Sequence, residues 1–294
     1  MSKNSSKIDR NFANIFKVRL DSTSKARVLT FVRDSIGRNS KFSIFTLNPE
    51  IILEAVKDVK YREILNSSNL SIPDGIGLAQ AVKYLGLQGP NNQILRFFSC
   101  FFQGLVVGLS TFFNKKWLLS SLTIIKGREL FLDLTKLANK KSWKVFFLGG
   151  RGDVGQKTKE KLQTSLKSVK IKTSAGPILD KEGKPVNRKE MELEKETINQ
   201  INEFKPQLLF VAFGAPKQER WVYKWLSRLD IGGAMVVGGT FEYFADKVAF
   251  PPLWMEKGGL EWIWRLISQP QRIKRIFKAV IIFPLKVFWF KVNS

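Results

Sequence analysis

The chain contains no histidine among its 294 residues and only one cysteine, Cys100. Without histidine, the commonest general base, the commonest metal ligand and every Ser-His or Cys-His nucleophile are excluded. One cysteine cannot form an intramolecular disulfide and is typical of a reducing compartment, and it argues against a structural zinc site. Acid–base chemistry must therefore fall to Asp, Glu, Lys or Tyr.

Acidic residues are also scarce, with 25 Asp and Glu against 49 Lys and Arg, so the net charge is +24. Such a field attracts nucleic acid, anionic lipid or a phosphorylated substrate. Zinc-finger, RNP-type and basic-zipper patterns are missing from the sequence. A basic nucleic-acid-binding protein remains an alternative on charge alone.

Short apolar runs alternate with helical stretches along most of the chain, which predicts an α/β fold. We expect a mainly parallel, Rossmann-like sheet with helices on both faces, spanning 41–250. Residues 1–40 are predicted to be an N-terminal extension, either loose or holding a first strand near 28–32. The predicted strands are 42–48, a strand ending at 73, 145–149, one starting at 171, 208–213 and 234–237.

A buried strand at 208–213 runs into the turn Gly214-Ala-Pro216, and Lys217, Gln218 and Glu219 follow at once. A proline at this position is typical of a helix start. Ligands of open α/β sheets bind at this edge, and helix N-termini favour anions. The block indicates a protein that handles a phosphorylated small molecule.

Asp74, within Pro-Asp-Gly at a predicted strand end, is the best candidate for a general base. Its alternative is a turn or helix-capping aspartate. Thr46 and Asn48 follow another strand and would either orient a hydroxyl or cap the helix that begins at 49.

Gly149 and Gly150 belong to a Gly-rich turn that is similar to a dinucleotide fingerprint, although a Walker lysine motif is missing. Glu242 would bond a base or ribose, or be an ordinary surface acid. No two aspartates are separated by a single residue, the arrangement with which many sugar-nucleotide enzymes hold a metal. We therefore expect neither a metal site nor a cofactor.

Two apolar segments do not fit the alternation. Residues 97–114 carry no charge, at the lower limit for a membrane span. They would form a core helix, a membrane-dipping or interfacial segment, or a true span; we favour the interfacial interpretation. Residues 251–294 combine four tryptophans with basic residues, which suits a helical appendage on anionic lipid or a helix packed on the domain.

Taken together, the motifs closely resemble the WecG/TagA/CpsF family of glycosyltransferases over about 42–278. The motifs that carry this resemblance are Thr-x-Asn at 46–48, Pro-Asp-Gly-Ile-Gly at 73–77, Phe-Leu-Gly-Gly at 147–150, Gly-Ala-Pro-Lys-Gln-Glu at 214–219, Val-Gly-Gly-Thr-Phe at 237–241, and the tail motifs at 259–265 and 269–272.

The resemblance implies inverting, metal-independent transfer of an N-acetylmannosamine-type sugar from UDP to an undecaprenyl-diphosphate-linked acceptor. The setting would be the cytoplasmic face of the bacterial plasma membrane, in synthesis of a surface polysaccharide or a teichoic-acid-type linkage. The enzyme would be peripheral, bound to anionic lipid, without a nucleic-acid partner, and a homo-oligomer is compatible with the family.

The resemblance also assigns roles. Asp74 would be the base, with Thr46 and Asn48 on the acceptor side. Gln218 and Glu242 would contact the nucleotide, although the family more usually has Asp at 242. The remaining implied UDP-binding residues are Gly149, Gly150, Gly214 and Lys217 in the sheet domain and Arg265, Arg272 and Arg275 in an appendage that closes over the site.

Two departures from the family pattern stand out. Residues 88–123 form a long apolar insertion where the family has a short linker. The following Ile-Ile-Lys-Gly-Arg-Glu at 124–129 lacks a family arginine, for which Lys126 or Arg128 would substitute. A catalytically inactive membrane scaffold of the same fold is therefore a further alternative.

Overall fold

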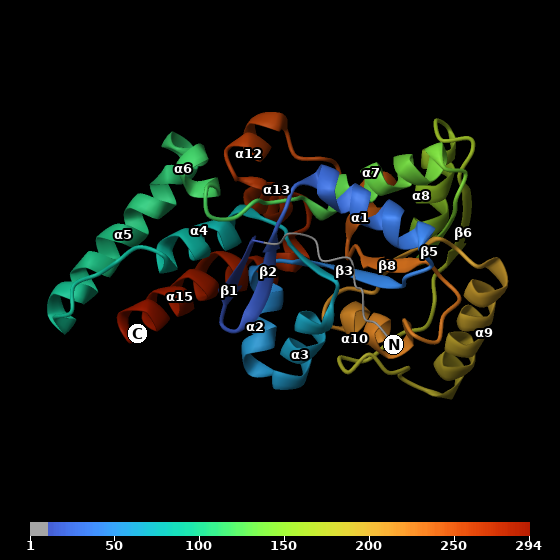
Figure 1. Ribbon diagram of the computed structural model, residues 1–294, viewed down its shortest axis with the longest axis horizontal. Coiled ribbons are helices and arrows are strands. Elements are labelled where there is room, and N and C mark those ends of the chain that lie inside the picture. The colour runs from blue at the N-terminus through green and yellow to red at the C-terminus, as the bar shows by residue number, and fades with distance from the viewer. Residues whose placement is uncertain (1–10) are drawn as a thin grey trace.

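The computed structural model describes residues 11–294, which form a six-stranded sheet surrounded by helices (Figure 1). Its strand order is β4-β3-β8-β7-β5-β6, and every neighbouring pair is parallel. The predicted α/β fold with a mainly parallel sheet is thus confirmed. The strands are β3 (Phe42–Leu47), β4 (Leu70–Pro73), β5 (Lys144–Gly149), β6 (Lys170–Ser174), β7 (Leu208–Ala212) and β8 (Gly233–Val236).

Helices cover both faces of the sheet because the strands are apolar on both sides. In β5, Val145 and Phe147 pack into one cluster, while Phe146 and Leu148 pack into the opposite one. The first face carries α1 (Lys25–Gly37), α7 (Gly127–Lys140), α8 (Val154–Gln163) and α11 (Thr240–Phe244). The second carries α2 (Pro49–Lys57), α3 (Val59–Ser67), α9 (Arg188–Phe204) and α10 (Lys217–Trp225).

The N-terminal part differs from our expectation of a loose extension or a strand near 28–32. Strands β1 (Asn11–Ile15) and β2 (Val18–Ser22) form an antiparallel hairpin whose Ile15, Val18 and Leu20 are fully buried. The apolar patch lies in helix α1, because Val28, Phe31 and Val32 have the spacing of one helical face. Residues 1–10 of the predicted extension lie outside the described part.

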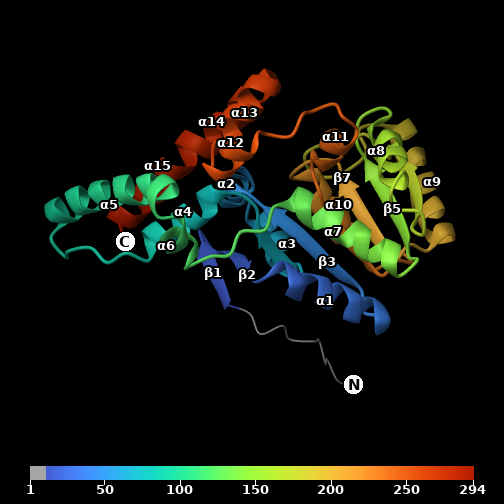
Figure 2. The ribbon, with the colours of Figure 1, turned by 90° about the horizontal axis from the view of Figure 1, so that it is seen from above.

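A helical lobe extends from the β4 edge of the sheet (Figure 2). Helix α4 (Ile76–Leu85) leads into it, followed by α5 (Gln93–Phe113) and the short α6 (Lys115–Leu119). Helix α5 is long and apolar enough to cross a membrane, but only 22% of its most apolar window is buried. It is therefore not a core helix, and eight of its large apolar side chains are more than half exposed: Ile94, Leu95, Phe98, Phe102, Val106, Leu109, Phe112 and Phe113.

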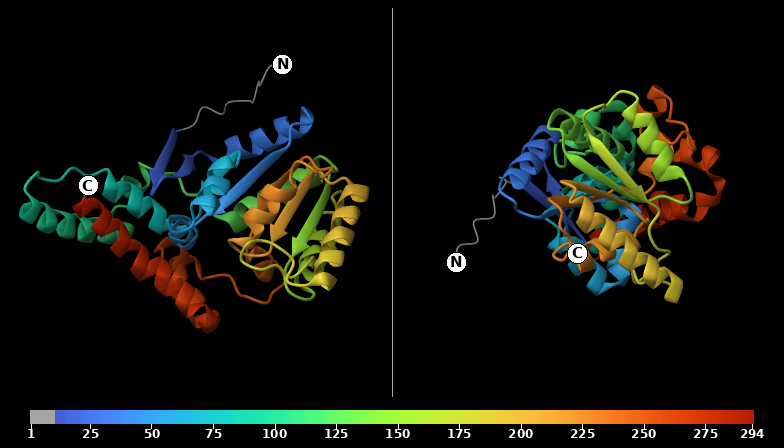
Figure 3. Two further views of the ribbon diagram at one scale, coloured as in Figure 1. Left: turned by 90° about the horizontal axis from the view of Figure 1, so that it is seen from below. Right: turned by 90° about the vertical axis from the view of Figure 1, so that its right-hand side faces the viewer.

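Residues 251–294, called the appendage below, run from the sheet edge back to this lobe (Figure 3). Its last helix packs against α4 and α5 through Phe283 and Val287, which are 1% and 2% exposed. Pro284 lies in the first turn of that helix, directly after a π-helical turn. The elements are α12 (Leu253–Lys257), α13 (Glu261–Ser268), η1 (Pro270–Arg272), α14 (Ile273–Phe277), η2 (Lys278–Ile282) and α15 (Phe283–Val292).

Candidate active site

A pocket of about 900 Å³ lies at the carboxyl ends of the strands, beneath the appendage. It gathers all the predicted site residues except Gly149, from segments that are far apart in the sequence. These are Thr46, Asn48, Asp74, Gly150, Gly214, Lys217, Gln218, Glu242, Arg265, Arg272 and Arg275. The pocket therefore lies at the carboxyl edge of the sheet, where the sequence predicts ligand binding.

Asp74 follows directly after β4, and its backbone N–H donates to the carbonyl of Leu47 at 2.7 Å. Burial raises the pKa of Asp74; the charges of Arg265 and Arg128 oppose this, and Glu261 adds to it. A raised pKa makes a carboxylate a stronger base. The environment of Asp74 thus suits proton abstraction.

Gly127, which sequence reasoning missed, brings helix α7 up to this carboxylate. A Cβ atom here would lie 3.2 Å from Asp74 Oδ2 and 3.2 Å from Thr46 Cγ2. The absence of a side chain therefore lets the N-terminus of α7 reach Asp74. In the sequence this glycine reads as an ordinary helix start, and only the fold places it opposite β3 and β4.

Thr46 and Asn48 make structural bonds as well as lining the pocket. The Thr46 hydroxyl donates to the Val236 carbonyl at 3.2 Å, which ties β3 to β8. Asn48 Oδ1 accepts from the backbone N–H of Ile51 at 3.0 Å and so caps α2. The capping interpretation of Asn48 is confirmed, and it leaves the amide nitrogen as the donor available to a ligand.

Gln218 joins two turns of the pocket wall. Its Oε1 accepts from the backbone N–H groups of Gly214 and Gly238, each at 3.1 Å, and its Nε2 donates to Glu219 at 2.8 Å. The side chain is only 3% exposed. Gln218 therefore fixes the positions of these two turns.

Glycine is required by backbone geometry at the last residue of β5. Gly149 has φ +94°, and a Cβ there would lie 2.8 Å from the Ala212 carbonyl carbon. Gly149 thus allows β5 and β7 to pack closely, while its neighbour Gly150 lines the pocket.

In the turn after β7, Lys217 also lines the pocket and donates to the Leu179 carbonyl at 2.5 Å.

Three arginines of the appendage approach the pocket. Arg272 Nη2 lies 2.8 Å from Glu242 Oε2, which also accepts from Gln269 at 3.1 Å. Arg275 donates to Glu50 at 2.6 Å. Glu242 thus holds the appendage to the sheet domain instead of being an ordinary surface acid.

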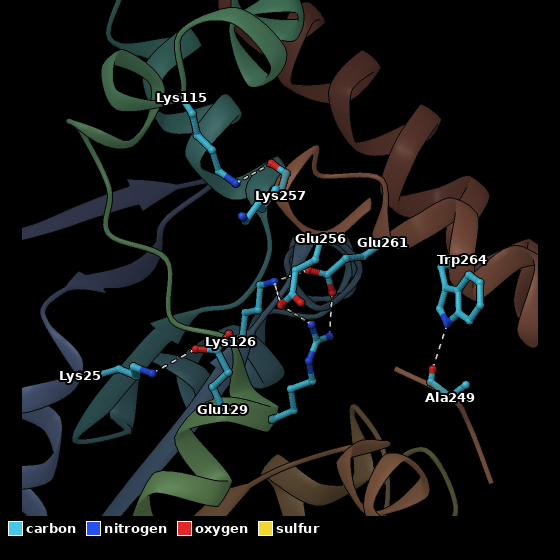
Figure 4. Close-up of polar contacts among 10 residues, drawn as sticks. Lys25, Lys115, Lys126, Glu129, Ala249, Glu256, Lys257, Glu261 and Trp264 are labelled. Atoms are coloured by element: carbon cyan, nitrogen blue, oxygen red, sulfur yellow. Dashed lines mark hydrogen bonds and ion pairs between the residues drawn. The ribbon is translucent and has the colours of Figure 1, made fainter. Parts of the chain in front are cut away.

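A second contact joins the appendage to α7, and we call it the clasp (Figure 4). Arg128 contacts Glu256 and Glu261, each at 2.7 Å, and Lys126 contacts the same two carboxylates. Burial raises the pKa values of both glutamates, but bonds to Lys126 and Arg128 lower them below the ordinary range. The two glutamates of the clasp are therefore ionised at neutral pH.

The two acids of the clasp were not predicted from the sequence, whereas Lys126 and Arg128 were named as substitutes for a missing arginine. Both cations do line the pocket. Tyr243 provides a shared platform: the guanidinium of Arg128 lies 5.6 Å from its ring centre and that of Arg265 lies 5.8 Å away. The cations of the pocket are thus held in fixed positions around Asp74.

Within 11–294, no three Asp, Glu or Cys side chains are grouped as a metal site would need. A parallel sheet whose carboxyl edge brings a carboxylate together with several arginines is typical of α/β proteins that bind phosphate-bearing ligands. Comparison with family models then gives a match to the "Glycosyl transferase WecG/TagA/CpsF family" over 13–101 and 106–294. The chain belongs to this family of glycosyltransferases.

The match extends beyond the limits set by the motifs and takes in most of the segment 88–123. Two relatives carry the name N-acetylglucosaminyldiphosphoundecaprenol N-acetyl-beta-D-mannosaminyltransferase. The one from Bacillus subtilis (strain 168) is 30% identical over 79% of this chain and 74% of its own length. The one from Staphylococcus aureus (strain MRSA252) is 27% identical over 97% of this chain and 93% of its own.

Proposed function

We propose that this glycosyltransferase moves an N-acetylmannosamine-type sugar from UDP to a sugar acceptor linked to undecaprenyl diphosphate. The names of the relatives support this choice of sugar and acceptor. The observation that carries the proposal is the meeting of Asp74 with Arg265, Arg272 and Arg275 in one pocket. A base and a group of fixed cations are what a single displacement at a sugar diphosphate needs.

In the proposed reaction, Asp74 removes the proton from the acceptor hydroxyl as that oxygen attacks the anomeric carbon. Attack opposite the leaving diphosphate inverts the configuration of that carbon. The bond to the diphosphate breaks, and UDP leaves with increased negative charge. Arginines stabilise this charge because they stay ionised and because one guanidinium group can donate two hydrogen bonds to phosphate oxygens.

We further propose that the reaction proceeds without a metal ion. The cations of the pocket support this, since Arg265, Arg272 and Arg275 already supply the charge that a divalent metal would bring to the leaving group. The lipid acceptor and the exposed apolar face of α5 support a peripheral enzyme on the cytoplasmic face of the plasma membrane. The product would enter a surface polysaccharide or a teichoic-acid-type linkage.

The test is UDP release from UDP-N-acetylmannosamine with a lipid-diphosphate-N-acetylglucosamine acceptor in the presence of EDTA. We expect release that requires the acceptor and continues in EDTA. Binding of UDP without turnover would instead support the inactive scaffold. Salt-sensitive binding of an oligonucleotide without UDP binding would support the nucleic-acid alternative.

A further inference from the structure

A second cavity, separate from the active-site pocket, lies in the helical lobe. It measures about 520 Å³, within the range of about 300–1,000 Å³ that is usual for small-ligand sites. Helices α4, α5 and α15 form its walls, and these helices pack against one another in pairs. We call it the apolar groove; its lining residues include Ala81, Phe101, Leu105, Gly108, Val287 and Phe288.

Among residues 11–294, those that line the groove carry no charge, and two of its polar side chains are bonded to protein partners. The Gln80 amide donates to Thr111 Oγ1 at 2.7 Å. The Tyr84 hydroxyl donates to the Cys100 carbonyl at 3.2 Å. The groove therefore contacts a ligand mainly through apolar side chains and selects little by hydrogen bonding. Its ligand should accordingly be apolar.

The shape of the groove favours a linear ligand. On α5 its lining runs from Phe97 to Gly108, a rise of about 16 Å along the helix axis. Residues Pro284, Leu285 and Phe288 of α15 follow the opposite wall. An extended hydrocarbon chain fills such a space better than a compact molecule does.

The first turn of α4 connects the groove to the active site. Asp74 lines the active-site pocket, and Gly77, three positions further on, lines the groove. A Cβ atom at Gly77 would lie 3.2 Å from the Pro49 side chain, next to the pocket residue Asn48. A lipid whose sugar lies at Asp74 can therefore place its chain in the groove.

We propose that the apolar groove binds the polyprenyl chain of the lipid-linked acceptor. This inference rests on the proposed function, which supplies a substrate with a long apolar chain attached to a diphosphate. Apolar residues exposed on the two long walls, such as Phe102 and Leu285, place the groove where the helices would meet a membrane. The chain would pass from the bilayer into the groove while the sugar reaches the base.

Gly108 provides a variant that fills the groove without a local clash, since a Cβ there has no neighbour within 4 Å. Gly108→Phe adds a ring to the cavity. Val106→Phe is the matched control, because Val106 lies on the same helix, is 57% exposed and does not line the groove. Circular dichroism and thermal unfolding test whether both variants fold.

The first measurement uses a benzophenone-bearing polyprenyl diphosphate in detergent micelles, with labelled peptides located by mass spectrometry. We expect labelling of α4, α5 and α15, reduced at least tenfold in Gly108→Phe and unchanged in Val106→Phe. Labelling confined to the outer face of α5, or equal in all three proteins, would overturn the proposal and indicate contact with the bilayer alone.

The second measurement compares KM values for acceptors with long and short prenyl chains. We expect the wild-type protein to prefer the long chain at least fivefold and Gly108→Phe to lose this preference. An unchanged preference in Gly108→Phe would contradict the proposal. Failure of the wild-type protein to transfer to any acceptor would instead reject the proposed function, whereas the labelling result would still decide whether the groove binds prenyl chains.

Discussion

The sheet edge and the appendage contribute to the same pocket by different means. Asp74, Thr46 and Gly214 are set in place by the ends of buried strands and by backbone hydrogen bonds. The appendage is held over the pocket by ion pairs, such as Arg272 with Glu242 and Arg128 with Glu261, and by helix packing in the lobe. This contrast indicates a division of roles: a base fixed by the strand ends of the sheet, and cations positioned by the ion pairs and helix packing of the appendage.

The largest effect on activity is expected from substituting Asp74, at the carboxyl edge of the sheet. Asp74→Asn should lower kcat by about 10²- to 10⁴-fold, the usual contribution of a general base. Because burial raises the pKa of Asp74, its ionised form costs stability, so the variant should unfold at a higher temperature at neutral pH. UDP-release kinetics and calorimetry measure the two effects; near-normal turnover would reject the base assignment.

A smaller loss of activity is expected from substituting an arginine of the appendage. Arg265→Gln should lower kcat by about 10²- to 10³-fold, because it removes one group that stabilises the leaving diphosphate. Arg188→Gln is the control, since its side chain is 93% exposed and does not line the pocket. Equal activity of the two variants would remove Arg265 from the mechanism.

The clasp should affect attachment of the appendage. Glu261→Gln leaves Arg128, which is 8% exposed, with a weaker partner, and should cost about 1–3 kcal/mol in the free energy of unfolding. The surface pair of Arg188 with Glu192 gives the control, Glu192→Gln, expected to change stability by less than about 0.5 kcal/mol. Limited proteolysis near 258–260 would show whether the appendage detaches; equal behaviour of the two variants would contradict the role of the clasp.

Acidification should release the same contact. The pKa values of Glu256 and Glu261 are lowered in the folded protein, so their stabilisation is complete above the ordinary Glu value of about 4.3. It is lost as the pH falls through the lower folded values. Proteolysis with pepsin across this range should show the appendage cut first; simultaneous loss of sheet and appendage would indicate that the two regions do not separate.

The smallest expected effect is a shift in the pH at which kcat rises on the acid side of its profile. The acid limb of kcat should lie above the ordinary Asp pKa of about 3.9, because the pKa of Asp74 is raised. Activity should increase with pH through this limb as Asp74 loses its proton. A limb at or below that value would show that Asp74 is not the titrating base.

The strands and the motif residues could be predicted because their pattern is local. Apolar runs followed at once by polar residues identify strand ends, and parallel strand ends share one edge. The partners of those residues could not be predicted: Gly127 approaches Asp74, and Glu256 meets Arg128, only after distant segments pack. The N-terminal hairpin was missed because polar and basic residues interrupt its apolar ones. Only in the folded protein are three of its apolar residues seen to be buried: Ile15, Val18 and Leu20.

The division of roles can be tested most directly by calorimetric titration of UDP into three proteins: the wild type, Asp74→Asn and Arg265→Gln. The arginine should contact the diphosphate, whereas the aspartate should act on the acceptor. We therefore expect UDP to bind Asp74→Asn as tightly as the wild type, or more tightly, and Arg265→Gln at least tenfold more weakly. Weakened binding in Asp74→Asn with unchanged binding in Arg265→Gln would contradict this account.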